Sequence, residues 1–102
     1  MLFRSCLLLR PLPDRTAEAA ACAALRPEKD VDGMTAASQS FVYSGAGVGF
    51  APCTAEAVVD LLEGSGVDLS GLRATVVGRS PVIGRPVAML LLQKNADRKS
   101  VV

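Results

Sequence analysis

The 102-residue chain contains no histidine and no tryptophan, and its aromatic residues are one tyrosine and three phenylalanines. Without histidine, these residues cannot form a Ser-His-Asp or Cys-His catalytic centre or a His-ligated metal site. Aromatic platforms for base stacking are scarce, and the formal net charge is only +1. A nucleic-acid-binding protein normally has such platforms or a basic stripe. We therefore expect no nucleic-acid partner and no metal.

The chain also lacks closely spaced cysteines and long hydrophobic runs. Cys6, Cys22 and Cys53 form no Cys-x-x-Cys pair, which argues against a disulfide framework or a zinc site. Free thiols are typical of a reducing compartment, so we expect a cytoplasmic protein. The first residues contain arginine but no acid before Asp14, which leaves a mitochondrial or plastid location open. No run approaches the length of a transmembrane helix, and no membrane partner is expected.

Half of the residues are hydrophobic, and their pattern alternates between strand and helix. A continuous apolar run at 6–9 predicts a buried strand, and an alanine-rich segment at 16–25 predicts a helix. After a loop come a second predicted helix at 55–63, a β-branched strand at 74–77 and an apolar helix at 87–92. This order predicts an α/β protein with parallel strands.

One turn in this pattern has the features of a phosphate site. The predicted strand ends at Gly78, the turn carries Arg79 and Ser80, and the next helix starts near Gly84. Such a connection directs backbone N–H groups and a positive helix end at one point. The spacing departs from G-x-G-x-x-G, so a plain β-turn-α connection is about equally consistent with it. Arg79 and Ser80 favour phosphate binding, because arginine makes bidentate contacts to phosphate.

Four motifs, in this order along the chain, resemble one enzyme family. Residues 78–86, Gly-Arg-Ser-Pro-Val-Ile-Gly-Arg-Pro, resemble the Gly-Arg-Ser-x-x-Val-Gly-x-Pro motif of the bifunctional methylenetetrahydrofolate dehydrogenase/methenyltetrahydrofolate cyclohydrolase family. Residues 11–13, Pro-Leu-Pro, resemble the end of its Gln-Leu-Pro-Leu-Pro segment. Residues 27–33 and 50–54 resemble its Pro-x-Lys-Asp-Val-Asp-Gly and Phe-x-Pro-Cys-Thr elements. Four ordered motifs are far more specific than one glycine turn.

The resemblance implies a fold, a domain division and a reaction. Residues 1–63 would be the C-terminal part of a folate-binding α/β catalytic domain, and residues 64–96 the first βα unit of a Rossmann-type NAD(P)-binding domain. The implied cofactor is NADP, with NAD as the alternative, and the implied substrate is a tetrahydrofolate derivative. Hydride would pass from the methylene carbon of the folate to the nicotinamide, and the cyclohydrolase would add water to the methenyl product. The full-length parent enzyme would be a homodimer.

The resemblance also implies which residues hold each ligand. The NADP phosphates would be bound by the glycine turn, at Gly78, Arg79, Ser80 and Gly84. The folate would be bound by Leu8, Leu9, Arg10, Pro11 and Asp32.

The two aspartates of residues 27–33 have two interpretations. Asp32 matches a carboxylate that hydrogen-bonds the amino and ring N–H groups of the pterin, and a carboxylate can accept two parallel bonds. Alternatively, Asp30 and Asp32 only shape a turn that ends at Gly33. We favour the folate role for Asp32 and a structural role for Asp30.

Departures from the family pattern bear on activity. Leu9 replaces a glutamine that sits beside the catalytic lysine of the family, and Ser38 stands where the family usually has asparagine. The family's Tyr-x-x-x-Lys motif has no counterpart, because Tyr43 is followed four residues later by Gly47. No catalytic residue of the family is present, so we expect this isolated chain to be an inactive fragment of the enzyme. The alternative is a non-catalytic paralogue that binds nucleotide or folate, or pairs with an intact subunit.

The last six residues, 97–102, differ from the family. The family continues here into a Thr-Val-Thr strand, whereas this chain has Asp-Arg-Lys-Ser-Val-Val. That hexapeptide resembles the translation of a sequencing-library adapter, so we expect an artefactual tail on a truncated transcript. A genuine divergent tail is the alternative, and a normal coding continuation after Ala96 would support it.

Overall fold

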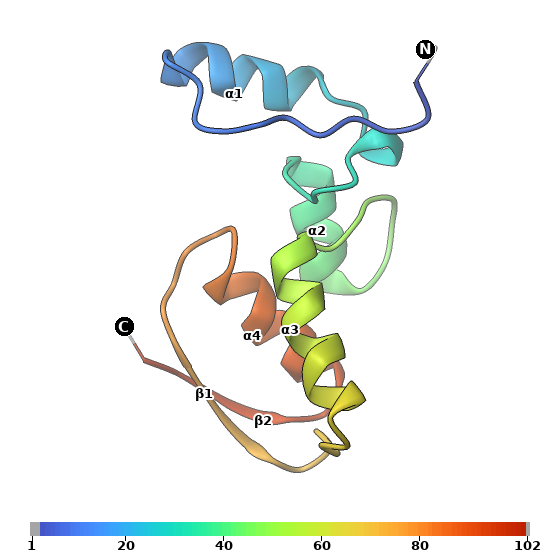
Figure 1. Ribbon diagram of the computed structural model, residues 1–102, viewed down its shortest axis with the longest axis vertical. Helices are drawn as coiled ribbons and strands as arrows, with labels where there is room; N and C mark the ends of the chain where they lie inside the picture. Colours follow the sequence, from blue (N-terminus) through green and yellow to red (C-terminus); the bar gives the residue numbers. More distant parts are fainter. Residues whose placement is uncertain (1–2, 102) are drawn as a thin grey trace. The chain divides into compact units, whose positions relative to one another are not determined.

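The computed structural model describes the backbone of residues 3–101 and the side chains of residues 3–96. The chain forms two compact units, Met1–Ala51 and Pro52–Val102. The first contains α1 (Arg15–Ala24), a short 3-10 helix (Pro27–Lys29) and α2 (Ala36–Ser44). The second contains α3 (Cys53–Gly64), β1 (Arg73–Val77), α4 (Gly84–Gln93) and β2 (Asp97–Val101), as Figure 1 shows. Two parallel strands joined through a helix confirm the predicted α/β class.

Helix α1 forms as its sequence predicts. Asp14 has an extended backbone and caps the helix, since its Oδ1 accepts a hydrogen bond of 2.9 Å from the N–H of Thr16. Six of the ten helical residues in Arg-Thr-Ala-Glu-Ala-Ala-Ala-Cys-Ala-Ala are alanine, which has the highest helix propensity of all residues. The chain returns to an extended conformation at Leu25, two residues before Pro27.

Helix α2 was not predicted, and the loop expected there is wrong. Its sequence, Ala-Ala-Ser-Gln-Ser-Phe-Val-Tyr-Ser, has few strong helix formers. The ends of the helix compensate for this. The hydroxyl of Thr35 accepts a hydrogen bond of 3.1 Å from the N–H of Ser38, and Gly45 ends the helix with a φ of 74°.

The buried strand predicted at 6–9 is also wrong. Cys6 forms one isolated parallel bridge with Asp30, through a hydrogen bond of 2.8 Å from its N–H to the carbonyl of Lys29. Beyond that bridge the segment does not continue as a strand, and Leu9 is 77% exposed. The apolar run therefore lies along the surface of its unit, because a single bridge provides no sheet in which to bury it.

The second unit is a β1–α4–β2 crossover covered by α3. The strands pair in parallel, with Arg73 opposite Asp97 and Val77 opposite Val101. Helix α4 packs against both strands and against α3. Burial along β1 alternates, so that Ala74 and Val76 contact the core. The core consists of residues from both helices, the turn before β1 and the position just before β2: Ala55, Val59, Leu69, Val87, Leu91 and Ala96.

The core explains where the two compact units divide. Helix α3 lies in the second compact unit because its Ala55 and Val59 are buried in that core. The assignment of residues 1–63 to a catalytic domain and of 64–96 to a cofactor domain stays a prediction. So does the origin of the last six residues, of which Asp97–Val101 form β2.

Candidate functional site

The turn between β1 and α4 brings two glycines into contact. A Cβ atom on Gly84 would lie 2.8 Å from both the carbonyl carbon and the carbonyl oxygen of Gly78. Gly78 itself has a φ of +139°, a conformation that residues with a side chain rarely adopt. Only glycine at both positions allows this turn, so its compactness follows directly from the sequence.

Ser80 stabilises the turn through two hydrogen bonds. Its carbonyl accepts a hydrogen bond of 2.9 Å from the N–H of Arg85, and its Oγ accepts one of 3.2 Å from the N–H of Val82. Pro86 has no N–H, and Ile83 at the N-cap provides no side-chain acceptor. The turn is therefore held mainly by its own backbone and by Ser80.

Two exposed arginines give this turn a positive charge. Arg79 lies on the turn and makes no hydrogen bond or ion pair with the residues that the structure describes. Arg85, which the sequence analysis did not select, is exposed in the first turn of α4. A cation beside a helix N-terminus attracts anions, and a guanidinium can hold a phosphate bidentately. The position of Arg85 directly after Gly84, at the predicted start of the helix, was the signal in the sequence that would have identified it.

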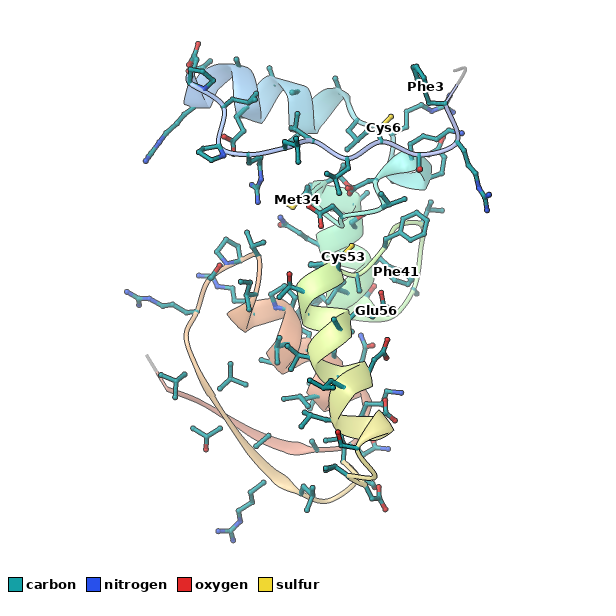
Figure 2. All side chains as sticks on the ribbon, in the orientation of Figure 1. Phe3, Cys6, Met34, Phe41, Cys53 and Glu56 are labelled. Carbon is teal, nitrogen blue, oxygen red and sulfur yellow. The ribbon has the colours of Figure 1, made fainter. Side chains whose placement is uncertain are left out.

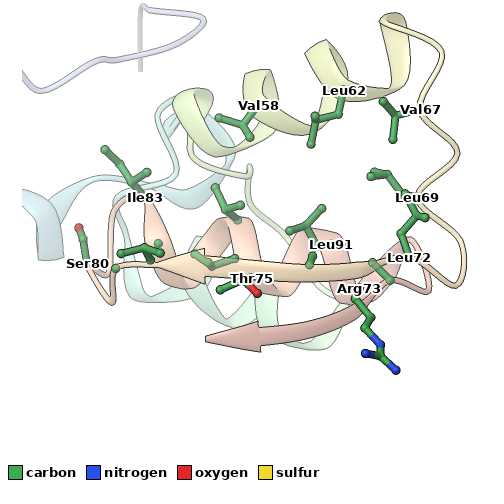
Figure 3. A pocket seen from close by; sticks show the side chains of 17 residues that line it. Val58, Leu62, Val67, Leu69, Leu72, Arg73, Thr75, Ser80, Ile83 and Leu91 are labelled. Carbon is green, nitrogen blue, oxygen red and sulfur yellow. The ribbon is translucent and has the colours of Figure 1, made fainter. Parts of the chain in front are cut away.

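An apolar groove of about 600 Å³ begins at this turn and runs along β1. Figure 3 shows Ser80 and Ile83 at one end, and Leu69 and Leu72 at the other. Val58 and Leu62 line it from α3, and Leu91 lines it from α4. Gly78, Ser80 and Gly84 therefore share one cavity, in which an apolar wall lies next to the arginine-bearing turn.

A second candidate site surrounds the carboxylate of Asp30, which is 0% exposed. Its Oδ1 accepts a hydrogen bond of 2.9 Å from the N–H of Met34, and its Oδ2 accepts one of 2.8 Å from the N–H of Thr35. The hydroxyl of Ser38 donates a third, of 2.7 Å, to Oδ2. Figure 2 labels Met34 where the turn leads into α2. These donors confirm a structural role for Asp30.

The same contacts determine the ionisation of Asp30. Burial alone would raise the pKa of this carboxyl, but hydrogen bonds from Met34, Thr35 and Ser38 outweigh it and hold the pKa below the usual value of 3.8. The ionised form is therefore favoured in the folded chain relative to the unfolded one.

A pH dependence of stability follows. A lowered folded-state pKa means that Asp30 stabilises the fold fully above its unfolded value and loses that contribution as pH falls through the lower folded value. We expect the free energy of unfolding to fall at acidic pH less steeply in Asp30→Asn than in the unaltered chain. Urea titrations from neutral pH down to about pH 2 measure this. Parallel profiles for the two proteins would contradict the prediction.

Asp32 lies beside Asp30 in a different environment. It occupies the turn between Asp30 and Gly33, and is half-buried. Its side chain has no hydrogen-bond or ion-pair partner among the described residues. A half-buried carboxylate that is not satisfied within the chain is available to a ligand, which is what a folate-contacting residue requires.

Three of the four remaining predicted folate residues line two grooves of the first unit. Leu8 lines an apolar groove of about 370 Å³ beside Ala21 and Leu25. Arg10 and Pro11 line another, of about 520 Å³, where the guanidinium of Arg10 lies 3.4 Å from the carboxylate of Glu18. Leu9 lies in neither groove, and Asp32 lines neither. The Cys6–Asp30 bridge places the start of this segment next to the Asp32 turn.

The described residues contain neither a cluster of metal ligands nor a membrane-spanning helix. No group of three or more His, Cys, Asp or Glu side chains gathers there as a metal site. None of the described helices has both the length and the apolar character needed to cross a membrane.

Comparison with known proteins identifies relatives of this chain. Residues 52–101 match the model of the tetrahydrofolate dehydrogenase/cyclohydrolase, NAD(P)-binding domain family. The chain is 46% identical over 90 residues to bifunctional protein FolD of Clostridioides difficile, covering 88% of this chain and 31% of that relative. It is 48% identical over 93 residues to bifunctional protein FolD 1 of Salinispora arenicola, covering 88% and 32%. The chain therefore spans about a third of the length of the curated relatives it matches.

Solved structures agree over both compact units. The bifunctional FolD dehydrogenase/cyclohydrolase of Campylobacter jejuni superposes with a TM-score of 0.87 at 33% identity, covering 95% of this chain and 34% of that one. FolD of Trypanosoma brucei, complexed with NADP cofactor and inhibitor, gives 0.84 at 35% identity, covering 96% and 33%. Motifs, domain model, relatives and fold coincide, and the chain belongs to the tetrahydrofolate dehydrogenase/cyclohydrolase family.

Proposed function

We propose that this chain carries part of an NADP-dependent 5,10-methylenetetrahydrofolate dehydrogenase with 5,10-methenyltetrahydrofolate cyclohydrolase activity. In this proposal Gly78, Arg79, Ser80 and Gly84 bind the phosphates of NADP, and Asp32 binds the pterin of the folate. The observation that carries it is the contact between Gly78 and Gly84, which forms a tight turn with Arg79 exposed on it at the start of α4. The match of residues 52–101 to an NAD(P)-binding domain supports it.

We further propose that the isolated chain is a fragment of the enzyme and does not catalyse the dehydrogenase reaction. The family's lysine has no counterpart, since Tyr43 is followed by Gly47 rather than lysine four residues later. Leu9 replaces the family's glutamine and cannot hydrogen-bond a lysine or a water. Purified chain supplied with methylenetetrahydrofolate and NADP should form no NADPH. Sustained turnover would refute this part of the proposal.

Arg79 should set the affinity for NADP. Removing one bidentate, charge-assisted contact costs about 1.5–3 kcal/mol, so Arg79→Ala is expected to weaken NADP binding by at least about tenfold. Titration calorimetry of the purified chain with NADP measures this. Arg73→Ala is the matched control, because Arg73 is also exposed but lies at the other end of β1. An equal loss of NADP affinity in the two variants would show that only the net charge matters, and would contradict the proposed phosphate contact of Arg79.

A non-catalytic subunit is the second candidate function. It is favoured by Leu9, which is 77% exposed where the family has the glutamine that sits beside its catalytic lysine. Such a subunit would bind NADP or folate, or pair with an intact copy of the enzyme. Complementation of a dehydrogenase-deficient strain with the complete gene separates the candidates. Growth supports the enzyme, whereas growth only when an active subunit is co-expressed supports the non-catalytic role.

A further inference from the structure

We propose that Asp30 is a positioning residue whose carboxylate, together with Ser38, fixes the turn that presents Asp32 to the folate. This inference rests on the proposed folate role of Asp32. It extends that role to two residues that have no contact with solvent, since Asp30 and Ser38 are each 0% exposed. Any effect of Asp30 on a ligand must therefore pass through residues that it holds.

Asp30 fixes both ends of the Asp32 turn. Its backbone carbonyl accepts a hydrogen bond of 3.2 Å from the N–H of Gly33, which closes the turn with Asp32 just before its end. Its carboxylate then accepts hydrogen bonds from the next two backbone N–H groups, at 2.9 Å from Met34 and 2.8 Å from Thr35. One residue thus binds three successive N–H groups immediately after Asp32. The backbone of Asp32 has little freedom between these anchors.

Ser38 connects this turn to a distant loop. Its Oγ donates to Oδ2 of Asp30 at 2.7 Å and accepts a hydrogen bond of 3.2 Å from the N–H of Phe50. Residue 50 precedes the Pro-Cys-Thr element of the family motif. Ser38 therefore bridges the Asp30 carboxylate and Phe50, the first residue of the 50–54 motif segment, within the first unit.

The chemistry requires a carboxylate at position 30. Three donors converge on the two oxygens, and an ionised carboxylate accepts hydrogen bonds at both. In asparagine one oxygen becomes an NH₂ group, which would face a backbone N–H at hydrogen-bond distance. Asp30→Asn thus breaks at least one bond of the cluster with almost no change in volume, which makes it the appropriate test substitution.

A thermodynamic cycle tests whether Asp30 acts through Asp32. Tetrahydrofolate binding to the full chain is measured for the unaltered protein, Asp30→Asn, Asp32→Asn and the double variant. We expect Asp30→Asn to weaken binding by about tenfold in the unaltered background and by less than about twofold in the Asp32→Asn background. The same loss in both backgrounds would overturn the proposal. Asp14→Asn is the matched control: an identical substitution at the exposed cap of α1, where asparagine caps equally well.

Hydrogen exchange tests the same proposal without a ligand. The N–H of Gly33 bonds to the backbone carbonyl of residue 30, which Asp30→Asn retains. If the carboxylate fixes the turn, this amide should lose at least about tenfold of its protection in Asp30→Asn, while Leu25 at the end of α1 keeps its own. Unchanged protection of Gly33 would overturn the proposal.

Ser38→Ala provides a second, milder variant if Asp30→Asn unfolds the unit. It removes one donor to Asp30 and the acceptor for both Phe50 and the Thr35 hydroxyl, and leaves both backbone bonds to the carboxylate in place. We expect faster exchange at both Gly33 and Phe50. Faster exchange at Phe50 alone would overturn the inferred link. If the unaltered chain binds no tetrahydrofolate, the proposed role of Asp32 fails, and exchange at Gly33 still decides whether Asp30 fixes the turn.

Discussion

Replacing Gly84 with alanine should destabilise the second unit by about 2 kcal/mol and weaken NADP binding by more than about tenfold. The added Cβ would lie 2.8 Å from the carbonyl group of Gly78 and 3.1 Å from the N–H nitrogen of Arg79. These are backbone atoms, so no side-chain rotation can relieve the clash. The turn itself must shift, and it carries the residues proposed to hold the phosphates. Urea denaturation and NADP titration measure the two effects.

Gly64→Ala is the control for this substitution. Gly64 is the last residue of α3, and a Cβ there would meet nothing within 4 Å. Alanine is favoured over glycine in a helix, so the control should leave stability unchanged or raise it by up to about 1 kcal/mol. If Gly84→Ala behaves like Gly64→Ala, the close approach of the two turn glycines is not a constraint on the fold.

Replacing Gly49 with alanine should destabilise the first unit by about 3 kcal/mol. A Cβ at this position would lie 2.6 Å from the Cα of Ser38 and 2.8 Å from its Oγ. The φ of +152° adds strain for any residue with a side chain. Relief of the clash would move Ser38 away from Asp30, so loss of stability should be accompanied by faster exchange of the Phe50 amide. Denaturation and exchange on the same samples measure both.

Gly47→Ala separates the clash from the backbone strain. Gly47 also has a positive φ, of +107°, but a Cβ there would meet nothing within 4 Å. This variant should therefore show only the conformational penalty, about 1 kcal/mol. A loss in Gly49→Ala no greater than that in Gly47→Ala would show that close packing on Ser38 contributes nothing.

Features that depend on neighbouring residues in the sequence, such as helix propensity, capping and glycine turns, could be predicted. The alanine-rich helix with its aspartate cap, the helix predicted at 55–63 and the β-branched strand before Gly78 all appear within a few residues of their predicted limits. The glycine turn was found for the same reason, since Gly78 and Gly84 are only six residues apart and their spacing determines its form.

Features that depend on distant partners could not be predicted. Whether the apolar run at 6–9 becomes a strand depends on the edge it meets, and Lys29 and Asp30 provide only one bridge. Ser38 contacts Phe50 from twelve residues away, and nothing in the local sequence of either residue indicates that pair. The structural role of Asp30 was expected, but its hydrogen bond to Ser38, eight residues further on, depends on how the chain folds between them.

The single pairing of β1 affects the solubility of the chain. Within the described residues, β1 is hydrogen-bonded along one edge only, to β2, and Val77 at its end is 81% exposed. Open edges with β-branched residues template pairing between chains, and a charged side chain is the usual protection against it. On β1 that protection comes from Arg73 alone. We therefore expect concentration-dependent precipitation of the purified chain, which the substitution Thr75→Lys at an exposed position of β1 would suppress.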